Sequence, residues 1–128
     1  MKRLSKRVVK ARTIVELDLL KKLGPRTWLV PGSHGRRYVV YRRKGTTQFE
    51  CHRDLGGHGM EACPGNSNGT VCYHVMAAII AAAREKGQWV SFCEKQEDAE
   101  RLANLGGKVW PIFSAQGKGQ LWLVVRGR

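Results

Sequence analysis

Four side chains between residues 51 and 74 constrain the fold of this chain more than any other feature. Cys51, Cys63, Cys72 and His74 have the spacing Cys-x11-Cys-x8-Cys-x-His. Three thiolates and one imidazole form a closed tetrahedral ligand set of the kind found in structural zinc sites. Thiolates are soft donors, which favours zinc over calcium or magnesium. The sequence therefore predicts one structural Zn²⁺ ion bound by these four residues.

Two histidines leave an alternative for the first ligand. His52 and His58 lie between Cys51 and Cys63, and either could replace Cys51. A catalytic metal cluster, for example that of a nuclease, would instead draw on His52, Asp54, His58 and Glu61. A closed four-ligand set has no open position for a water nucleophile. We therefore predict that the protein is not an enzyme.

The pattern around the cysteines predicts a small sheet, a loop and a helix. Alternating residues in "TWLVPG" and "RRYVVY" indicate a hairpin, and "TQFEC" indicates a third strand. Residues 51–70 are glycine-rich and are expected to be a long loop, which a metal would hold in place. The alanine-rich run "YHVMAAIIAAAREKG" predicts a helix over 73–87 that begins directly at the last two ligands.

Elements on either side complete the prediction. Residues 1–12 are expected to be frayed, and 13–24 to be a helix with Thr13 as its N-cap. The C-terminal segment is predicted to be β-α-β-β, with strands at 88–93, 108–115 and 120–126 around a helix at 94–107. Cys93 is interpreted as a buried strand thiol. The four tryptophans are expected to lie mainly in the core: Trp28, Trp89, Trp110 and Trp122.

Residues 27–80 resemble the SWIM zinc finger. The shared features are a Trp-led strand, the strand "RYVVY", a Cys-Pro pair at Cys63, and the Cys-x-His pair followed by an apolar helix. The chain departs from the family pattern at Glu61, where the family has its first cysteine. Cys51 takes that role if ten extra residues loop out. The resemblance implies a zinc-stabilised module that binds DNA or mediates protein contacts.

We therefore predict an α+β protein with a small zinc-stabilised antiparallel sheet plus a helix and a C-terminal β-α-β-β unit. The expected parts are a basic N-terminal arm and helix (1–26), a SWIM-like zinc finger (27–87) and the C-terminal extension (88–128).

Positive charge is concentrated in the first third of the chain. The net charge is +13, and residues 1–44 contain 14 Lys/Arg but two acids, whereas residues 45–128 contain nine Lys/Arg and eight acids. Such asymmetry indicates a polyanionic partner. We predict binding to nucleic acid, DNA rather than RNA, through a basic hairpin and the N-terminal arm. The candidate residues are Arg36, Arg37, Arg42, Arg43, Lys44, Lys6, Arg7 and Lys10.

The remaining predictions concern partners and location. The N-terminus has no secretory signal pattern and no apolar run is long enough to span a membrane, so no membrane partner is expected. We expect a cytoplasmic protein, associated with the nucleoid or, in a eukaryote, nuclear. The alternative function is a protein–protein adaptor that uses the finger and the C-terminal unit to hold a protein partner.

Overall fold

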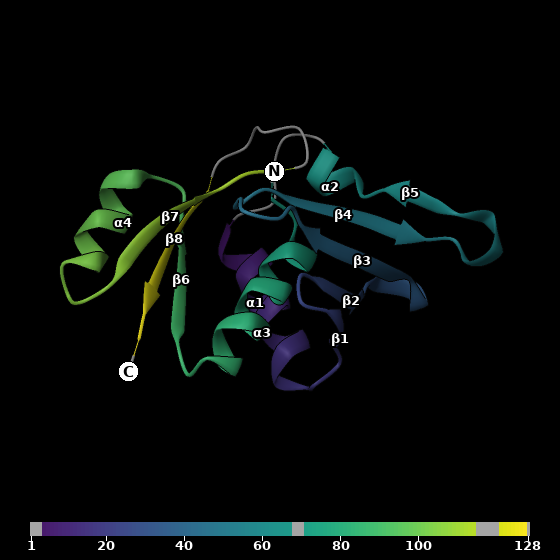
Figure 1. Ribbon diagram of the computed structural model, residues 1–128, viewed down its shortest axis with the longest axis horizontal. Coiled ribbons are helices and arrows are strands. Elements are labelled where there is room, and N and C mark those ends of the chain that lie inside the picture. Colours follow the sequence, from purple (N-terminus) through teal and green to yellow (C-terminus); the bar gives the residue numbers. More distant parts are fainter. Residues whose placement is uncertain (1–3, 68–70, 115–120, 128) are drawn as a thin grey trace.

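Two antiparallel sheets surround a central helix (Figure 1). The structure is a computed structural model, and it describes residues 4–67, 71–114 and 121–127. The five-stranded sheet has the order β1-β2-β3-β4-β5, and the three-stranded sheet has the order β6-β8-β7. The predicted α+β class, with a small antiparallel sheet, a helix and a C-terminal β-α-β-β unit, is confirmed.

The N-terminal helix lies earlier in the chain than predicted. Helix α1 is Leu4–Glu16, where a frayed arm was expected, and Lys21–Gly24 is strand β1 rather than the end of a helix. Thr13 does not cap this helix, because its hydroxyl donates to the Val9 carbonyl within it at 2.8 Å. The helix ends at Glu16, and two residues later Asp18 has a left-handed φ of 56° that turns the chain away. Its apolar face packs against α3 through Leu4, Val8, Ala11 and Val15.

The three strands predicted in "TWLVPG", "RRYVVY" and "TQFEC" are confirmed. Strand β2 is Thr27–Pro31, β3 is Arg37–Arg42 and β4 is Phe49–Asp54. They pair in register as a meander, with Trp28 opposite Val40 and Val40 opposite Cys51. Alternate residues of each strand are buried, as expected of a sheet with one covered face.

The prediction of a single long loop over residues 51–70 is wrong. Strand β4 continues to Asp54, the chain turns, and β5 (Met60–Ala62) pairs back along it. A short helix α2 (Pro64–Ser67) follows. The glycines supply the turn, where Gly56 and Gly59 have φ of 68° and 92°. The residues between Cys51 and Cys63 that are extra relative to the SWIM pattern therefore form this hairpin.

Helix α3 (Tyr73–Glu85) confirms the predicted helix over 73–87 and lies at the centre of the molecule. It is apolar on nearly every side, and most of its residues are buried. A helix of this kind needs neighbours on several faces. Helix α1, the five-stranded sheet and β6 all pack against it (Figure 1). None of the helices in the described part of the chain is long and apolar enough to cross a membrane.

The C-terminal unit has the predicted β-α-β-β order. It consists of β6 (Trp89–Cys93), α4 (Gln96–Ala103), β7 (Lys108–Ile112) and β8 (Leu121–Arg126), with β8 in the middle of its sheet. Residues 115–120, where the strand predicted at 108–115 ends and the one predicted at 120–126 begins, fall outside the described residues. Helix α4 covers the outer face of the sheet over a small cluster of Cys93, Ala99 and Val124. The buried position of Cys93 is confirmed.

The inner face of the C-terminal sheet joins the core of the five-stranded sheet. Ile112 and Leu121 belong to the same buried cluster as Trp28 and Met76. The backbone also links the two sheets, because the Phe49 N–H donates to the Phe113 carbonyl at 3.1 Å. The prediction that all four tryptophans are core residues is wrong for two of them. Trp89 is 65% exposed and Trp110 is 47% exposed, while Trp28 is buried.

Candidate metal centre

The four predicted ligands meet in one buried cluster. The ligand atoms of Cys51, Cys63, Cys72 and His74 all lie within 4.8 Å of one another, and all four residues are buried. The Cys51 and Cys63 sulfurs each lie 3.7 Å from His74 Nδ1. None of the three cysteines forms a disulfide bond. The arrangement supplies four soft or borderline donors that could hold one metal ion.

The β4–β5 hairpin brings the first two ligands together. Cys51 lies in the middle of β4 and Cys63 directly follows β5. The Cys63 N–H donates to the Cys51 carbonyl at 2.9 Å, which closes the open end of the hairpin. Two residues that are far apart along the chain thus become neighbours across a strand pair. The turn of the hairpin lies away from the cluster, so its length does not disturb the ligands.

The other two ligands lie at the start of α3. Cys72 is the N-cap residue, with extended φ and ψ of −78° and 164°, and His74 is in the first turn. The Met76 N–H donates to the Cys72 carbonyl at 3.2 Å and fixes this junction. The change from extended to helical backbone lets a Cys-x-His pair direct both side chains to one centre.

Tyr38 and Gly32 hold the His74 ring in place. The Tyr38 ring stacks on it with centroids 3.8 Å apart and planes 20° apart, and Tyr73 packs beside it at 4.1 Å. A Cβ on Gly32 would lie 2.8 Å from Tyr38 Cδ1 and closer still to Cε1. Only glycine therefore fits beneath this stack. His74 Nε2 is buried and has no hydrogen-bond partner within the described residues, so Nδ1 is the nitrogen that faces the thiols.

Electrostatics in the cluster favour a bound cation. Hydrogen bonds that the Cys51 thiol donates to Cys63 and Cys72, and then burial, raise the pKa of that thiol far above its ordinary range. Burial raises the pKa of Cys72 to about 12. Three thiolates this close repel one another in a dry interior. A cation with charge +2 removes that repulsion and allows all three to ionise.

The alternative ligands lie elsewhere. His52 is on the opposite face of β4 from Cys51 and lies 3.3 Å from a Glu50 oxygen. His58 is exposed at the turn of the hairpin, and Asp54 pairs with Arg37. Of the groups of His, Cys, Asp and Glu in residues 4–67, 71–114 and 121–127, only the Cys/His cluster has the geometry of a metal site. The structure does not bring His52, Asp54, His58 and Glu61 together as a site.

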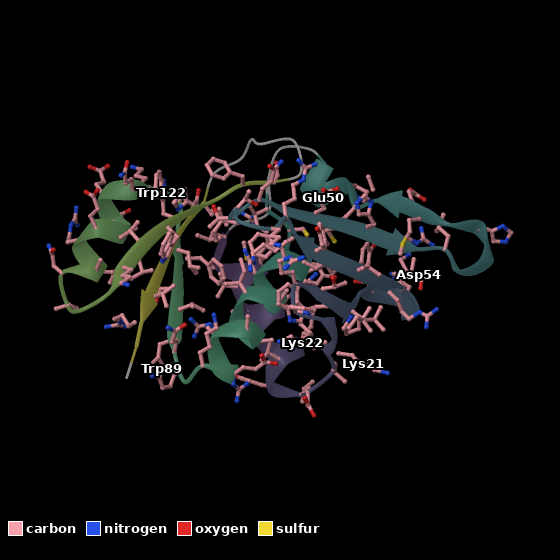
Figure 2. All side chains as sticks on the ribbon, in the orientation of Figure 1. Lys21, Lys22, Glu50, Asp54, Trp89 and Trp122 are labelled. Carbon is pink, nitrogen blue, oxygen red and sulfur yellow. The ribbon has the colours of Figure 1, made fainter. Side chains whose placement is uncertain are left out.

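The basic hairpin is partly neutralised by acids on the neighbouring strand. Arg37 lies 3.3 Å from Asp54, and Arg43 lies 2.7 Å from Glu50. Glu50 and Asp54 lie on β4, on the solvent face of the five-stranded sheet (Figure 2). The Arg43 hydrogen bond holds the pKa of Glu50 below its usual range. Arg42 donates to the Thr46 carbonyl at 3.0 Å, whereas Arg36 and Lys44 are exposed.

The N-terminal cations belong to a helix and not to a flexible arm. Lys6 and Lys10 are exposed one turn apart on α1, and the Lys10 ammonium lies 5.1 Å from the centre of the Tyr73 ring. Arg7 is half-buried and donates to the Val71 carbonyl. The sequence-based interpretation as an arm missed this, because the apolar face of α1 has few bulky residues. Lys2 and Arg3 lie outside the described residues.

A groove runs beside the metal centre. It has a volume of about 780 Å³ and is bounded by α1, the start of β3, the Cys63–Gly65 segment and the start of α3. Arg7, Arg36 and Tyr73 line it, together with one acid, Glu94. Lys10 reaches its edge through its contact with Tyr73. The structure thus places three of the predicted nucleic-acid-binding residues around one groove.

Three residues that support the cluster were not singled out from the sequence. They are Tyr38, Gly32 and Gly65, and a Cβ on Gly65 would lie 3.2 Å from Cys72 Cβ. The signal for Gly65 is its place directly after Cys-Pro, but nothing in the sequence connects Gly32 with His74. That contact depends on how β2 and β3 lie across α3.

Comparisons with known proteins leave the family open. No family model matches the chain, no curated protein is similar to it, and no solved structure matches it. The resemblance of residues 27–80 to the SWIM finger therefore stays an expectation.

Proposed function

We propose that this protein binds nucleic acid and that one structural zinc ion holds its binding surface rigid. The observation that carries the zinc proposal is the convergence of four buried ligand atoms. Tetrahedral zinc, with bonds of about 2.3 Å to sulfur and about 2.0 Å to nitrogen, separates these two ligand atoms by about 3.5 Å. The two distances from sulfur to His74 Nδ1 are 3.7 Å.

The donor set favours zinc over other ions. Thiolates bind calcium and magnesium poorly, and a four-coordinate tetrahedral set suits a d¹⁰ ion with no other geometric preference. With all four positions taken by the protein, the ion serves structure. It connects the base of the β4–β5 hairpin to the first turn of α3.

This arrangement also supports the SWIM-like proposal. The departure from the family pattern was the distance between Cys51 and Cys63 along the chain. The hairpin places these two residues side by side, as two cysteines separated by one residue would be at the end of a strand. We propose a SWIM-like finger with a β-hairpin inserted between its first two ligands.

The nucleic-acid proposal rests on the groove beside the metal centre. Phosphates are positioned by cations that are fixed in register, and a helix packed on the core holds cations more firmly than a free tail does. Arg7 and Arg36 line the groove, and Lys10 is at its edge. Arg7 Nε is buried with no hydrogen-bond partner in the described part of the chain. A double-stranded DNA backbone is the partner that we propose here.

The zinc proposal is tested by elemental mass spectrometry. We expect one zinc per chain in the wild type and loss of zinc in Cys51→Ser, Cys63→Ser, Cys72→Ser and His74→Ala. Cys93→Ala is the matched control, because Cys93 is also a buried thiol but lies in the other sheet. Retention of zinc by Cys51→Ser would show that the site differs from the one described. A wild-type protein without zinc contradicts the proposal.

The nucleic-acid proposal is tested by the salt dependence of binding to a short DNA duplex. The slope of log K against log salt is about −0.9 for each phosphate neutralised, so Lys10→Gln and Arg36→Gln should each make it less steep by about 1. Lys95→Gln is the control, because Lys95 is an exposed lysine beside α4. Absence of binding at low salt would reject the proposal and leave the protein-adaptor alternative as the remaining prediction.

A further inference from the structure

A second groove lies at the other end of α3. It is bounded by the last turns of α3, the β3–β4 turn and the inner face of the C-terminal sheet, and its volume is about 1000 Å³. That size is within the range of sites that enclose small ligands. The groove lies between the two sheets, so neither sheet forms it alone.

An exposed tryptophan lines this groove. Trp110 is on β7 between Lys108 and Ile112, which share its face, and it pairs with Leu123 of β8. Ile112 is buried in the common core, whereas Trp110 is 47% exposed. A large indole that is left half-exposed in a groove loses the benefit of burial, and such side chains are common at binding sites. Trp110 is therefore placed to contact a ligand with its ring.

The charge around the groove has one sign. Arg42, Lys86 and Lys108 line it, and Lys86 and Lys108 are exposed. Within the described part of the chain, no Asp or Glu lines it. By contrast, Arg37 and Arg43 on the solvent face of the five-stranded sheet have acidic partners. Cations without neighbouring acids favour an anionic ligand.

We propose that this groove binds an unpaired segment of single-stranded nucleic acid, with one base stacked on Trp110 and the flanking phosphates held by Lys86 and Lys108. This inference rests on the proposed function and adds a single-strand site to it. Each nucleotide carries both a flat π surface and one negative charge, and the groove offers a partner for both. An acidic peptide would interact only with the basic residues of the groove, and an apolar segment would contact only its apolar walls.

The test compares three ligands that differ in one property each. They are the oligonucleotide dT12, an abasic strand of the same length, and a 12-base-pair duplex. The abasic strand keeps the phosphates and lacks the bases. We expect the wild type to bind dT12 about tenfold more tightly than the abasic strand, because stacking of a base on an aromatic side chain contributes about that factor.

Substitutions at two exposed tryptophans supply the matched control. Trp110→Ala should weaken dT12 binding about tenfold and leave binding of the abasic strand unchanged, while Trp110→Phe should retain most of the affinity. Trp89→Ala should behave as the wild type, because Trp89 is 65% exposed but does not line this groove. Figure 2 shows Trp89 at the start of β6. Thermal unfolding of each variant checks that the fold is retained.

The two lysines should act differently from the tryptophan. The double variant Lys86→Gln/Lys108→Gln should weaken dT12 and the abasic strand alike. It should also make the salt slope less steep by about 0.7 for each lysine, which is the single-strand value. Lys95→Gln again serves as the control for loss of an exposed charge.

Several outcomes would overturn the inference. Equal binding of dT12 and the abasic strand, or a Trp110→Ala variant that binds dT12 like the wild type, would show that no base stacks in the groove; duplex binding would then leave the proposed function intact. Competition by a polyglutamate peptide as strong as that by dT12 would identify a charge-only site. A dimer that Trp110→Ala converts to monomer would assign the groove to a second copy of this chain. Failure of every oligonucleotide to bind rejects the proposed function first.

Discussion

The two sheets of this protein cover the same helix by different means. The five-stranded sheet places cysteines and a histidine-stacking tyrosine against the start of α3. The three-stranded sheet places Ile112, Leu121 and Leu123 against its other side and is covered on its outer face by α4. With the proposed zinc ion bound, the first contact depends on ionised sulfur and a cation, whereas the second depends on buried apolar area.

The two halves of the fold should therefore be destabilised by different conditions. Burying apolar area stabilises a contact at any ordinary pH. A cluster of thiols that must ionise is stable only while a metal ion compensates the charge. The common cluster around α3 nevertheless joins both halves, so a failure on one side should be felt on the other.

Removal of the metal should have the largest effect. Binding of structural zinc contributes about 10–16 kcal/mol. Because a domain is stable by only about 5–15 kcal/mol in total, a chelator should unfold the protein or abolish its cooperative transition. Hydrogen exchange should show loss of protection first in β4, β5 and the start of α3. Thermal unfolding followed by circular dichroism measures the overall effect.

Two controls sharpen this experiment. Cys93→Ala should keep its metal and respond to chelator as the wild type does, because Cys93 lies outside the cluster. Cys72→Ser should resemble the chelated wild type without any chelator. A wild-type melting temperature that chelator leaves unchanged would show that the five-stranded sheet does not depend on metal.

Truncation of a core residue in the C-terminal sheet should have the next largest effect. Ile112 is 1% exposed and belongs to the common cluster. Ile112→Ala should lower the free energy of unfolding by about 2–5 kcal/mol, through lost transfer energy and the cavity left behind. Denaturant unfolding should remain one transition whichever sheet is probed.

The control here is Leu105→Ala, because Leu105 is exposed beyond α4. It should change stability by less than about 0.5 kcal/mol. If Ile112→Ala instead produced two transitions, with the five-stranded sheet unaffected, the two halves would be energetically independent.

A methyl group added at Gly32 should have an intermediate effect on the metal side. Its Cβ would overlap the Tyr38 ring that stacks on His74. Gly32→Ala should cost about 1–3 kcal/mol, as overpacking usually does, and should also weaken zinc binding in a competition assay with a chelating dye. Gly57→Ala is the matched control, because a Cβ there meets nothing within 4 Å. Equal zinc affinity of the two variants would show that the stacking of Tyr38 on His74 does not support zinc binding.

Alkaline pH should have the smallest effect, and it should act on the C-terminal side. Burial, and to a lesser extent Asp98, raises the pKa of the Cys93 thiol above its ordinary value of 9.0. The folded state therefore favours the neutral thiol. The contribution of this thiol to the free energy of unfolding is fully present below its ordinary pKa, and it is lost as the pH rises through the raised pKa of the folded state. Between about pH 8 and pH 10, the wild-type melting temperature should fall by about 2 °C more than that of Cys93→Ala. If the melting temperatures of the two proteins fell equally over this pH range, the prediction would be wrong.

The sequence predicted those elements whose signal is local. The strands β2, β3 and β4 follow from alternation, α3 from an apolar run without breakers, and the metal ligands from donor type and spacing. Helix α1 was placed about nine residues too late, because its buried face consists partly of small or β-branched residues among many cations. Packing on α3 decided its position.

The β4–β5 hairpin was missed for a related reason. Strand β5 has three residues, all of them exposed, so it carries no hydrophobic pattern. Its pairing with β4 is a contact between backbones, and the glycines that permit the turn are equally typical of a loop. Ion pairs such as Arg37 with Asp54 depend on strand register. The exposure of Trp110 depends on the space left between two sheets.

By itself, the sequence determined the chemistry: which donors are present, where charge is concentrated, and which segments must be buried. These properties follow from residue types and short spacings, so they do not depend on the tertiary structure. The tertiary structure alone decided that Cys51 is beside Cys63, that two of the arginines are already paired, and that Trp110 faces a groove. These are relations between distant segments, and they are set by how sheets and helices pack around α3.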